Sequence, residues 1–134
     1  MNKSIFINLP VADLDKSIAF YAALGFEQNP QFSDETAACM VWSDAIYVML
    51  LTHAKWKTFT SRPIPPSTAS EVMLALACAD REAVDRLNDA AEQNGGTADI
   101  NPKQELGFMY NRNLADPDGH VWEMFWMDPA AMQG

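Results

Sequence analysis

The sequence contains one pattern twice: a short apolar strand, an acidic helix cap and an amphipathic helix. The two predicted strands cover Ser4–Val11 and Val72–Cys78, which are rich in the apolar and β-branched residues that favour strands. Asp13 and Asp80 follow these strands as helix N-caps and lie 67 positions apart in a chain of 134 residues. A repeat of about half the chain length predicts an internal duplication, and the alternative is a coincidence of two ordinary strand–helix starts.

The remaining elements follow from apolar periodicity and from glycine stops. Gly25 and Gly95 stand where the two helices are expected to end. Further short strands are predicted at Phe26–Phe32, Ala37–Trp42, Ile46–Thr52, Thr97–Ile100, Phe108–Leu114 and His120–Met127. The sequence therefore predicts a single α+β domain over residues 1–134, built from duplicated βαβββ modules. Module one covers residues 4–60, a linker covers 61–70 and module two covers 71–128.

The connection between the two modules, His53–Ser70, is long and rich in proline. Pro63, Pro65 and Pro66 exclude a long helix there, whereas His53–Phe59 can form one or two helical turns. A connection of this length can also fold over a cavity that the strands enclose.

Charge and composition exclude several classes of partner. Nine Lys plus Arg stand against eighteen Asp plus Glu, so the formal net charge is −9. Because an acidic surface repels phosphate groups, we expect no nucleic acid partner and no binding to anionic membranes. No stretch approaches the ~20 apolar residues of a membrane span, and Met1–Pro10 lacks the features of a signal peptide.

The two cysteines, Cys39 and Cys78, form no disulfide framework, which predicts inert buried thiols and a cytoplasmic location.

Two motifs resemble a known superfamily. Residues 13–26, Asp-Leu-Asp-Lys-Ser-Ile-Ala-Phe-Tyr-Ala-Ala-Leu-Gly-Phe, closely resemble the first helix of the vicinal oxygen chelate superfamily. Residues 116–123, Asp-Pro-Asp-Gly-His-Val-Trp-Glu, resemble its closing hairpin. The superfamily comprises glyoxalases, bleomycin-resistance proteins and extradiol dioxygenases. Residues 8–11, 31–34, 38–41 and 126–129 are similar to a bacterial branch of predicted lactoylglutathione lyases. The resemblance implies one cupped mixed sheet in each module, two modules side by side and a homodimer.

The resemblance also implies positions for metal ligands, which in metal-using members are His, Gln or Glu side chains inside the cup. Carried over to this chain, three of them fall on Phe6, Met73 and Glu123. The fourth falls on Met49 or, with a shift of one residue, on Leu50. Divalent cations need several oxygen or nitrogen ligands, and only Glu123 supplies one. We therefore predict that the cup holds no metal and needs no other cofactor.

Glu123 is the candidate catalytic residue. Its neighbours in Val-Trp-Glu-Met-Phe-Trp are apolar, and a carboxylate in such surroundings must be paired, hydrogen-bonded or exposed to a wet cavity. It would act as a general base, and the alternative is a structural carboxylate satisfied by its neighbours. His120 precedes it by three residues, so on a strand the two side chains point to opposite faces and cannot share a metal ion.

The lining of the cup is expected to be mainly apolar. The residues that share strand parity with the implied ligand positions are Phe6, Asn8, Met49, Met73 and Ala75. Such a lining suits a flexible apolar binding pocket, and the alternative is a filled core without a cavity.

Three further residues are candidates for ligand contacts at the cup. Trp56 would close the cup, and His53 would either reach over its rim or remain solvated. Arg112 would pair with Glu123 or hold a substrate carboxylate if it faces the cup, and would be solvated if it faces outward. Strand alternation alone does not decide between these two orientations.

These observations predict a glyoxalase/bleomycin-resistance-like protein that works without metal and binds a small hydrophobic or cationic molecule. The alternative is a lactoylglutathione lyase-like lyase or isomerase with Glu123 as its base. A third hypothesis is a dimeric module whose cup has lost both roles.

Overall fold

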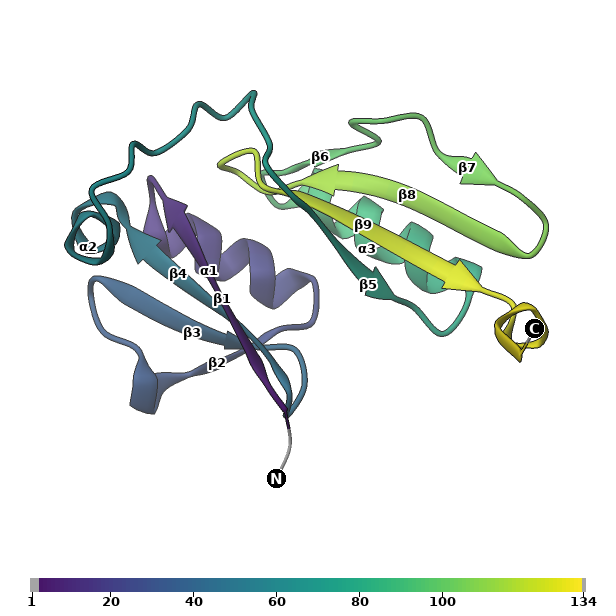
Figure 1. Cartoon of the computed structure of the whole chain (residues 1–134), viewed down its shortest axis with the longest axis horizontal. Helices are drawn as coiled ribbons and strands as arrows, with labels where there is room; N and C mark the ends of the chain where they lie inside the picture. The colour runs from purple at the N-terminus through teal and green to yellow at the C-terminus, as the bar shows by residue number, and fades with distance from the viewer. Residues whose placement is uncertain (1–2, 134) are drawn as a thin grey trace. The chain divides into compact units, whose positions relative to one another are not determined.

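The computed structural model describes residues 3–133, and the chain divides into two compact units, Met1–Pro66 and Ser67–Gly134. Each unit contains one mixed sheet with one long helix across one of its faces (Figure 1). The predicted α+β fold of two βαβββ modules is therefore confirmed. Within residues 3–133, no helix is long and apolar enough to cross a membrane.

The first unit contains a four-stranded sheet with the strand order β1-β4-β3-β2. β1 and β4 are parallel, and the other neighbouring pairs are antiparallel. The elements are β1 (Ile5–Val11), α1 (Leu14–Ala23), β2 (Glu27–Asn29), a 3₁₀ helix (Pro30–Phe32), β3 (Ala37–Val41), β4 (Ile46–Thr52) and α2 (His53–Phe59). The strand predicted over Phe26–Phe32 is wrong in its second half. Pro30 has no N–H for the strand ladder, and the Asn29 side chain caps the 3₁₀ turn instead.

Helix α1 begins where its capping residue predicts. Asp13 Oδ1 accepts a hydrogen bond from the backbone N–H of Lys16 at 3.1 Å, which satisfies one of the free donors of the first turn. The helix buries Phe20 and Tyr21, whose rings meet edge to face. Gly25 follows the helix with a φ of 107°, a conformation that favours glycine.

The two faces of the first sheet differ in burial toward its edge strand β1. Val48 and Leu50 of β4 and Met40 of β3 are completely buried on the face that α1 covers. Phe6 and Asn8 of β1 point the other way and are exposed. We call the face of each sheet that lies opposite its long helix the open face.

The second unit contains a sheet with the strand order β5-β9-β8-β6, and the short strand β7 also pairs with β8. The elements are β5 (Met73–Ala77), α3 (Arg81–Gln93), β6 (Thr97–Ala98), β7 (Gln104–Glu105), β8 (Met109–Ala115), β9 (Val121–Met127) and a 3₁₀ helix (Pro129–Gln133). β6 is shorter than the strand predicted over Thr97–Ile100, because Asp99 adopts a φ of 54° and leaves the extended conformation.

Helix α3 packs against β8 and β9 of the second sheet. It begins after Asp80, whose Oδ1 accepts a hydrogen bond from the backbone N–H of Ala83 at 2.8 Å. Val84 and Leu87 of the helix are buried, and Trp122 of β9 is only 1% exposed. This packing leaves the alternate residues of β5, β8 and β9 on the open face.

Candidate functional site

The open face of the first sheet carries an aromatic pair. The rings of Phe6 and Tyr47 are stacked, with 4.3 Å between their centroids and 5° between their planes. Phe6 is 55% exposed, so one side of the pair remains accessible. Asn8 and Met49 lie opposite each other further along the same two strands. The face thus combines an exposed aromatic surface with a flexible methionine and one amide.

The strand register answers the question of which residue in β4 is equivalent to Glu123. Asn8 is paired with Met49 in the first sheet, as Ala75 is paired with Glu123 in the second. Leu50 is completely buried on the helix-covered face. Met49 therefore occupies the position equivalent to Glu123, and the alternative of Leu50 is wrong.

The open face of the second sheet carries Glu123. Met73, 58% exposed, and Ala75 lie on the edge strand β5, and Glu123 lies beside Ala75 on β9. Glu123 is half-buried, and its carboxylate forms no hydrogen bond or ion pair with another residue of the described range 3–133. A carboxylate in this position can accept hydrogen bonds from a ligand or interact with its positive charge.

Two asparagines, which the sequence analysis missed, extend the polar part of this open face. Asn111 and Asn113 of β8 are only 3% and 6% exposed. Asn113 Oδ1 accepts a hydrogen bond from Asn101 Nδ2 at 2.7 Å, and Asn111 Nδ2 donates one to Gln104 Oε1 at 3.3 Å. The signal that could have found them is their alternation, since residues 111 and 113 of one strand must share a face.

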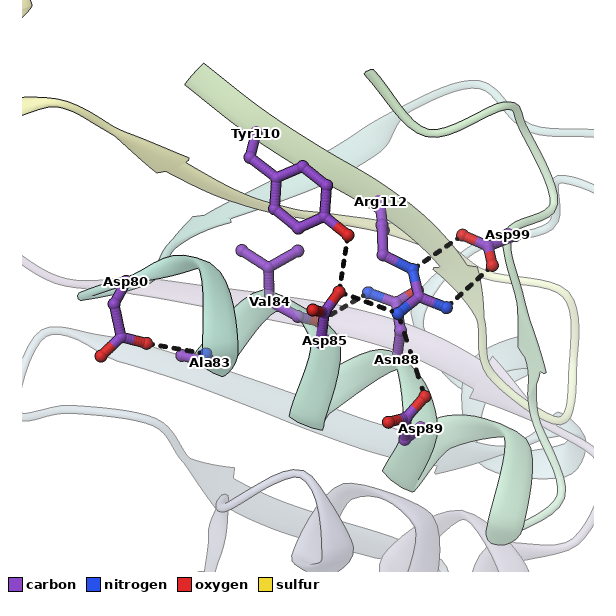
Figure 2. A network of polar contacts seen from close by, with 9 residues as sticks. All are labelled: Asp80, Ala83, Val84, Asp85, Asn88, Asp89, Asp99, Tyr110 and Arg112. Carbon is purple, nitrogen blue, oxygen red and sulfur yellow. Dashed lines mark hydrogen bonds and ion pairs between the residues drawn. The ribbon is translucent and has the colours of Figure 1, made fainter. Parts of the chain in front are cut away.

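Arg112 lies on the other face of the second sheet, toward α3. Its Nε and Nη2 donate to the two carboxylate oxygens of Asp99 at 2.9 and 2.8 Å, and its Nη1 donates to Asp85 Oδ1 at 3.0 Å (Figure 2). Tyr110 Oη donates to the same Asp85 oxygen at 2.6 Å. The hydrogen bonds to Asp99 and Asp85 raise the pKa of Arg112. Arg112 therefore does not point toward Glu123, and its placement among the ligand-contacting residues is corrected on geometric grounds.

The two predicted contacts from the connecting segment both lie on α2, which packs against β1 and β4. His53 is the first residue of this helix and is exposed. Trp56 is half-buried, and its Nε1 is buried without a hydrogen-bond partner among the described residues 3–133. His120 lies in the turn before β9, where its backbone N–H donates to Asp116 Oδ1 at 2.9 Å.

The family positions for metal ligands do not fit a divalent cation in this chain. Phe6, Met49 and Met73 offer no oxygen or nitrogen donor, so Glu123 would be the only family-type ligand. No group of three or more His, Cys, Asp or Glu side chains within residues 3–133 is arranged to hold a metal ion. A single carboxylate does not form such a site, and we assign no step to a metal.

Neither cysteine has the surroundings of a reactive thiol. Cys39 is 1% exposed and Cys78 is half-buried, and both are free. Burial raises the pKa of both thiols, which disfavours the nucleophilic thiolate at neutral pH.

The fold and these sequence positions agree with the comparison to known families. The model of the Glyoxalase/Bleomycin resistance protein/Dioxygenase superfamily matches residues 4–124. The chain belongs to this superfamily. A search of curated proteins finds no significant match.

Solved structures with this fold include several proteins of similar length. The hypothetical protein SA1046 from S. aureus is 28% identical with a TM-score of 0.78, and the match covers 94% of this chain and 95% of that one. The fosfomycin resistance protein FosX from Mesorhizobium loti is 13% identical with a TM-score of 0.71, covering 100% and 99%. A bleomycin resistance determinant encoded on the transposon Tn5 is 20% identical with a TM-score of 0.64, covering 95% and 99%. The last two are similar in fold alone.

Proposed function

We propose that this protein binds a small hydrophobic or cationic molecule on the open faces of its sheets and does so without a metal ion. The observation that carries the proposal is the chemistry of the four family ligand positions, where Phe6, Met49 and Met73 replace metal-binding side chains. Stacked Phe6 and Tyr47 offer an apolar surface, and methionines adapt to ligands of irregular shape. Glu123 adds a negative charge that favours a cationic group.

The proposal is tested by calorimetric titration with two cationic probes. Metal-free bleomycin is one, because a structural relative is a bleomycin resistance determinant, and the apolar dye rhodamine 6G is the other. Replacement of Phe6 by Ala removes half of the aromatic pair and should weaken binding of at least one probe by about tenfold, the effect of about 1.4 kcal/mol of lost apolar burial.

The matched control is Phe32→Ala in the 3₁₀ helix of the same unit, because Phe32 is equally apolar and 64% exposed. This variant should bind both probes as the wild type does. Failure of both probes to bind, or equal weakening by the two substitutions, would refute the proposal.

A second candidate function is that of a lactoylglutathione lyase-like lyase or isomerase, with Glu123 moving a proton between adjacent carbons. The observation that favours it is the half-buried Glu123 carboxylate without a partner among residues 3–133. The test is conversion of the hemithioacetal of glutathione and methylglyoxal in metal-free buffer, followed by ultraviolet absorbance. Activity in the wild type that is lost in Glu123→Gln supports an enzyme, and no activity above the uncatalysed reaction excludes this substrate.

We further propose that the protein forms a homodimer and works in the cytoplasm. The support is the superfamily to which the chain belongs, together with a composition that contains only two cysteines. Light scattering of the purified chain should give the mass of a dimer, and a monomer at micromolar concentration would contradict the first part of this proposal.

A further inference from the structure

Asn113 and Glu123 form a directly opposed pair on the open face of the second sheet. They are register partners of the antiparallel strands β8 and β9. Side chains in such a position have Cβ atoms about 5 Å apart and project from the same face of the sheet. A ligand group that contacts the Glu123 carboxylate therefore lies within reach of the Asn113 amide.

The hydrogen bonds of Asn113 leave its donor group available. Its Oδ1 accepts from Asn101 Nδ2 at 2.7 Å. Its Nδ2 forms no hydrogen bond with any other residue between 3 and 133, and neither does the Glu123 carboxylate. The open face thus presents one N–H donor group and one carboxylate acceptor side by side. A carboxamide carries the complementary pair, an N–H that donates to Glu123 and a carbonyl that accepts from Asn113.

The segment of residues 99–101 fixes the Asn113 amide through Asn101, and Arg112 holds this segment from the opposite face of the sheet. Ile100 N donates to the carbonyl of Asn113 at 3.2 Å, directly after Asp99 with its left-handed φ of 54°. A left-handed conformation costs an aspartate about 1 kcal/mol and persists only where other contacts impose it. Both carboxylate oxygens of Asp99 accept from Arg112, which is itself bound to Asp85 on α3 (Figure 2).

The contact between Arg112 and Asp99 fixes the orientation of both side chains, because it consists of two parallel hydrogen bonds. Arg112 is the neighbour of Asn113 on β8, and its planar guanidinium holds Asp99 with two hydrogen bonds at once. Only 13% of its side chain is exposed, so few of its donors are left to water. The position of Asp99 then determines where Asn101, two residues later, meets Asn113.

We propose that Asn113 is a ligand-contacting residue that selects carboxamide groups beside Glu123, and that Arg112 is its positioning residue. The inference rests on the proposed function, because it takes the open face that carries Glu123 as a binding face. It adds the ligand chemistry: a neutral amide is recognised by both side chains, whereas an ammonium group is recognised by Glu123 alone.

The experiment compares two small probes, benzamide and benzylamine, by NMR titration of the ¹⁵N-labelled full chain. Benzamide should shift the side-chain amide signals of Asn113, and benzylamine should not. Replacement of Asn113 by Leu, which keeps the volume, should weaken benzamide binding about fivefold, the effect of one hydrogen bond, and should leave benzylamine affinity unchanged. Glu123→Gln should weaken benzylamine binding.

The role of Arg112 is tested with Arg112→Lys, which keeps the charge and loses the paired hydrogen bonds to Asp99. The variant should weaken benzamide binding as Asn113→Leu does and retain benzylamine binding. A purely structural role for Arg112 would affect the two probes equally. Arg86→Lys on the exposed side of α3 is the control and should change neither affinity.

The outcomes separate this inference from the proposed function. Unchanged Asn113 signals on benzamide addition, or equal effects of Arg112→Lys on both probes, would overturn the inference even if bleomycin binding depends on Phe6. Selective loss of benzamide binding in both Asn113→Leu and Arg112→Lys supports it, even if the aromatic pair of the first unit binds nothing.

Discussion

Replacement of Arg112 by methionine should destabilise the protein by ~2–3 kcal/mol. Methionine retains the apolar stem that packs between α3 and β8. The lost interactions are the three hydrogen bonds to Asp99 and Asp85 and the longer ion pair between Arg112 Nη1 and Asp89 Oδ1 at 3.9 Å, which adds little because Asp89 is exposed. Hydrogen bonds to charged groups contribute about 1.5–3 kcal/mol each when buried. The side chains of Asp85 and Asp99 are 48% and 43% exposed and can be rehydrated, which reduces each contribution to about 1 kcal/mol.

The assay is equilibrium unfolding in urea at neutral pH, with the slope of free energy against urea concentration compared between variants. The lost ~2–3 kcal/mol of unfolding free energy should also lower the melting temperature in thermal unfolding by about 10 °C for a chain of this length. Arg86→Met is the matched control, since Arg86 is an exposed arginine of α3, the helix that carries Asp85, and its effect should stay within about 0.5 kcal/mol. Equal unfolding free energies for the wild type and Arg112→Met would refute the assignment of Arg112 as an anchor.

The same substitution has a defined pH dependence. Hydrogen bonds from Tyr110 and, to a smaller extent, from Arg112 lower the pKa of Asp85. The hydrogen bonds from Arg112 lower the pKa of Asp99. A carboxyl group whose pKa is lower in the folded state stabilises the fold above its unfolded pKa of about 3.9, and the stabilisation is lost as the pH falls through the folded value. The stability difference between the wild type and Arg112→Met should therefore be full at neutral pH and shrink below about pH 4. A stability difference that stays constant when the pH falls well below about 4 would contradict the ion-pair explanation.

Two further predictions concern backbone strain and thiol reactivity. Gly119→Ala should destabilise the protein by at least about 2 kcal/mol. Gly119 has a φ of 87°, which disfavours alanine, and the new Cβ would overlap the backbone carbonyl of Ser67. Gly107→Ala, at a φ of 81° with nothing within 4 Å, should cost only about 1 kcal/mol, and urea unfolding of both variants gives the comparison. In the folded protein, Cys78 should react slowly with a thiol reagent and Cys39 only on unfolding, since burial raises the pKa of both; rapid reaction of Cys39 would contradict its placement in the core.

The parts of the fold that depend on local signals could be predicted from the sequence. Asp13 and Asp80 cap their helices as expected, because a cap is a contact between residues three positions apart. The strand at Ile46–Thr52 and the helix at His53–Phe59 also agree with their predicted ranges. The duplication could be predicted because both copies retain an aspartate as helix N-cap and a similar spacing of apolar residues along the helix.

The parts that depend on distant partners could not be predicted. Strand alternation defines two faces and does not say which one a helix covers, so the orientation of Arg112 stayed open until Asp85 and Asp99 were placed beside it. The choice between Met49 and Leu50 required the register between β1 and β4.

The interruption of the predicted strand Thr97–Ile100 has a similar origin. Asp99 leaves the extended conformation while its carboxylate is held by an arginine 13 positions away, which no local propensity reports. The same contact brings Asn101 to Asn113, so the polar part of the candidate site was missed together with the strand end.

The most direct test of the central claim is the metal content of the purified protein after incubation with Ni²⁺, Zn²⁺ or Mn²⁺ and removal of unbound ions. Elemental analysis should find far less than one metal ion per chain, because Phe6, Met49 and Met73 replace three of the four ligands of metal-using relatives. One tightly held divalent ion per chain, lost on replacement of Glu123 by Gln, would contradict the metal-free account.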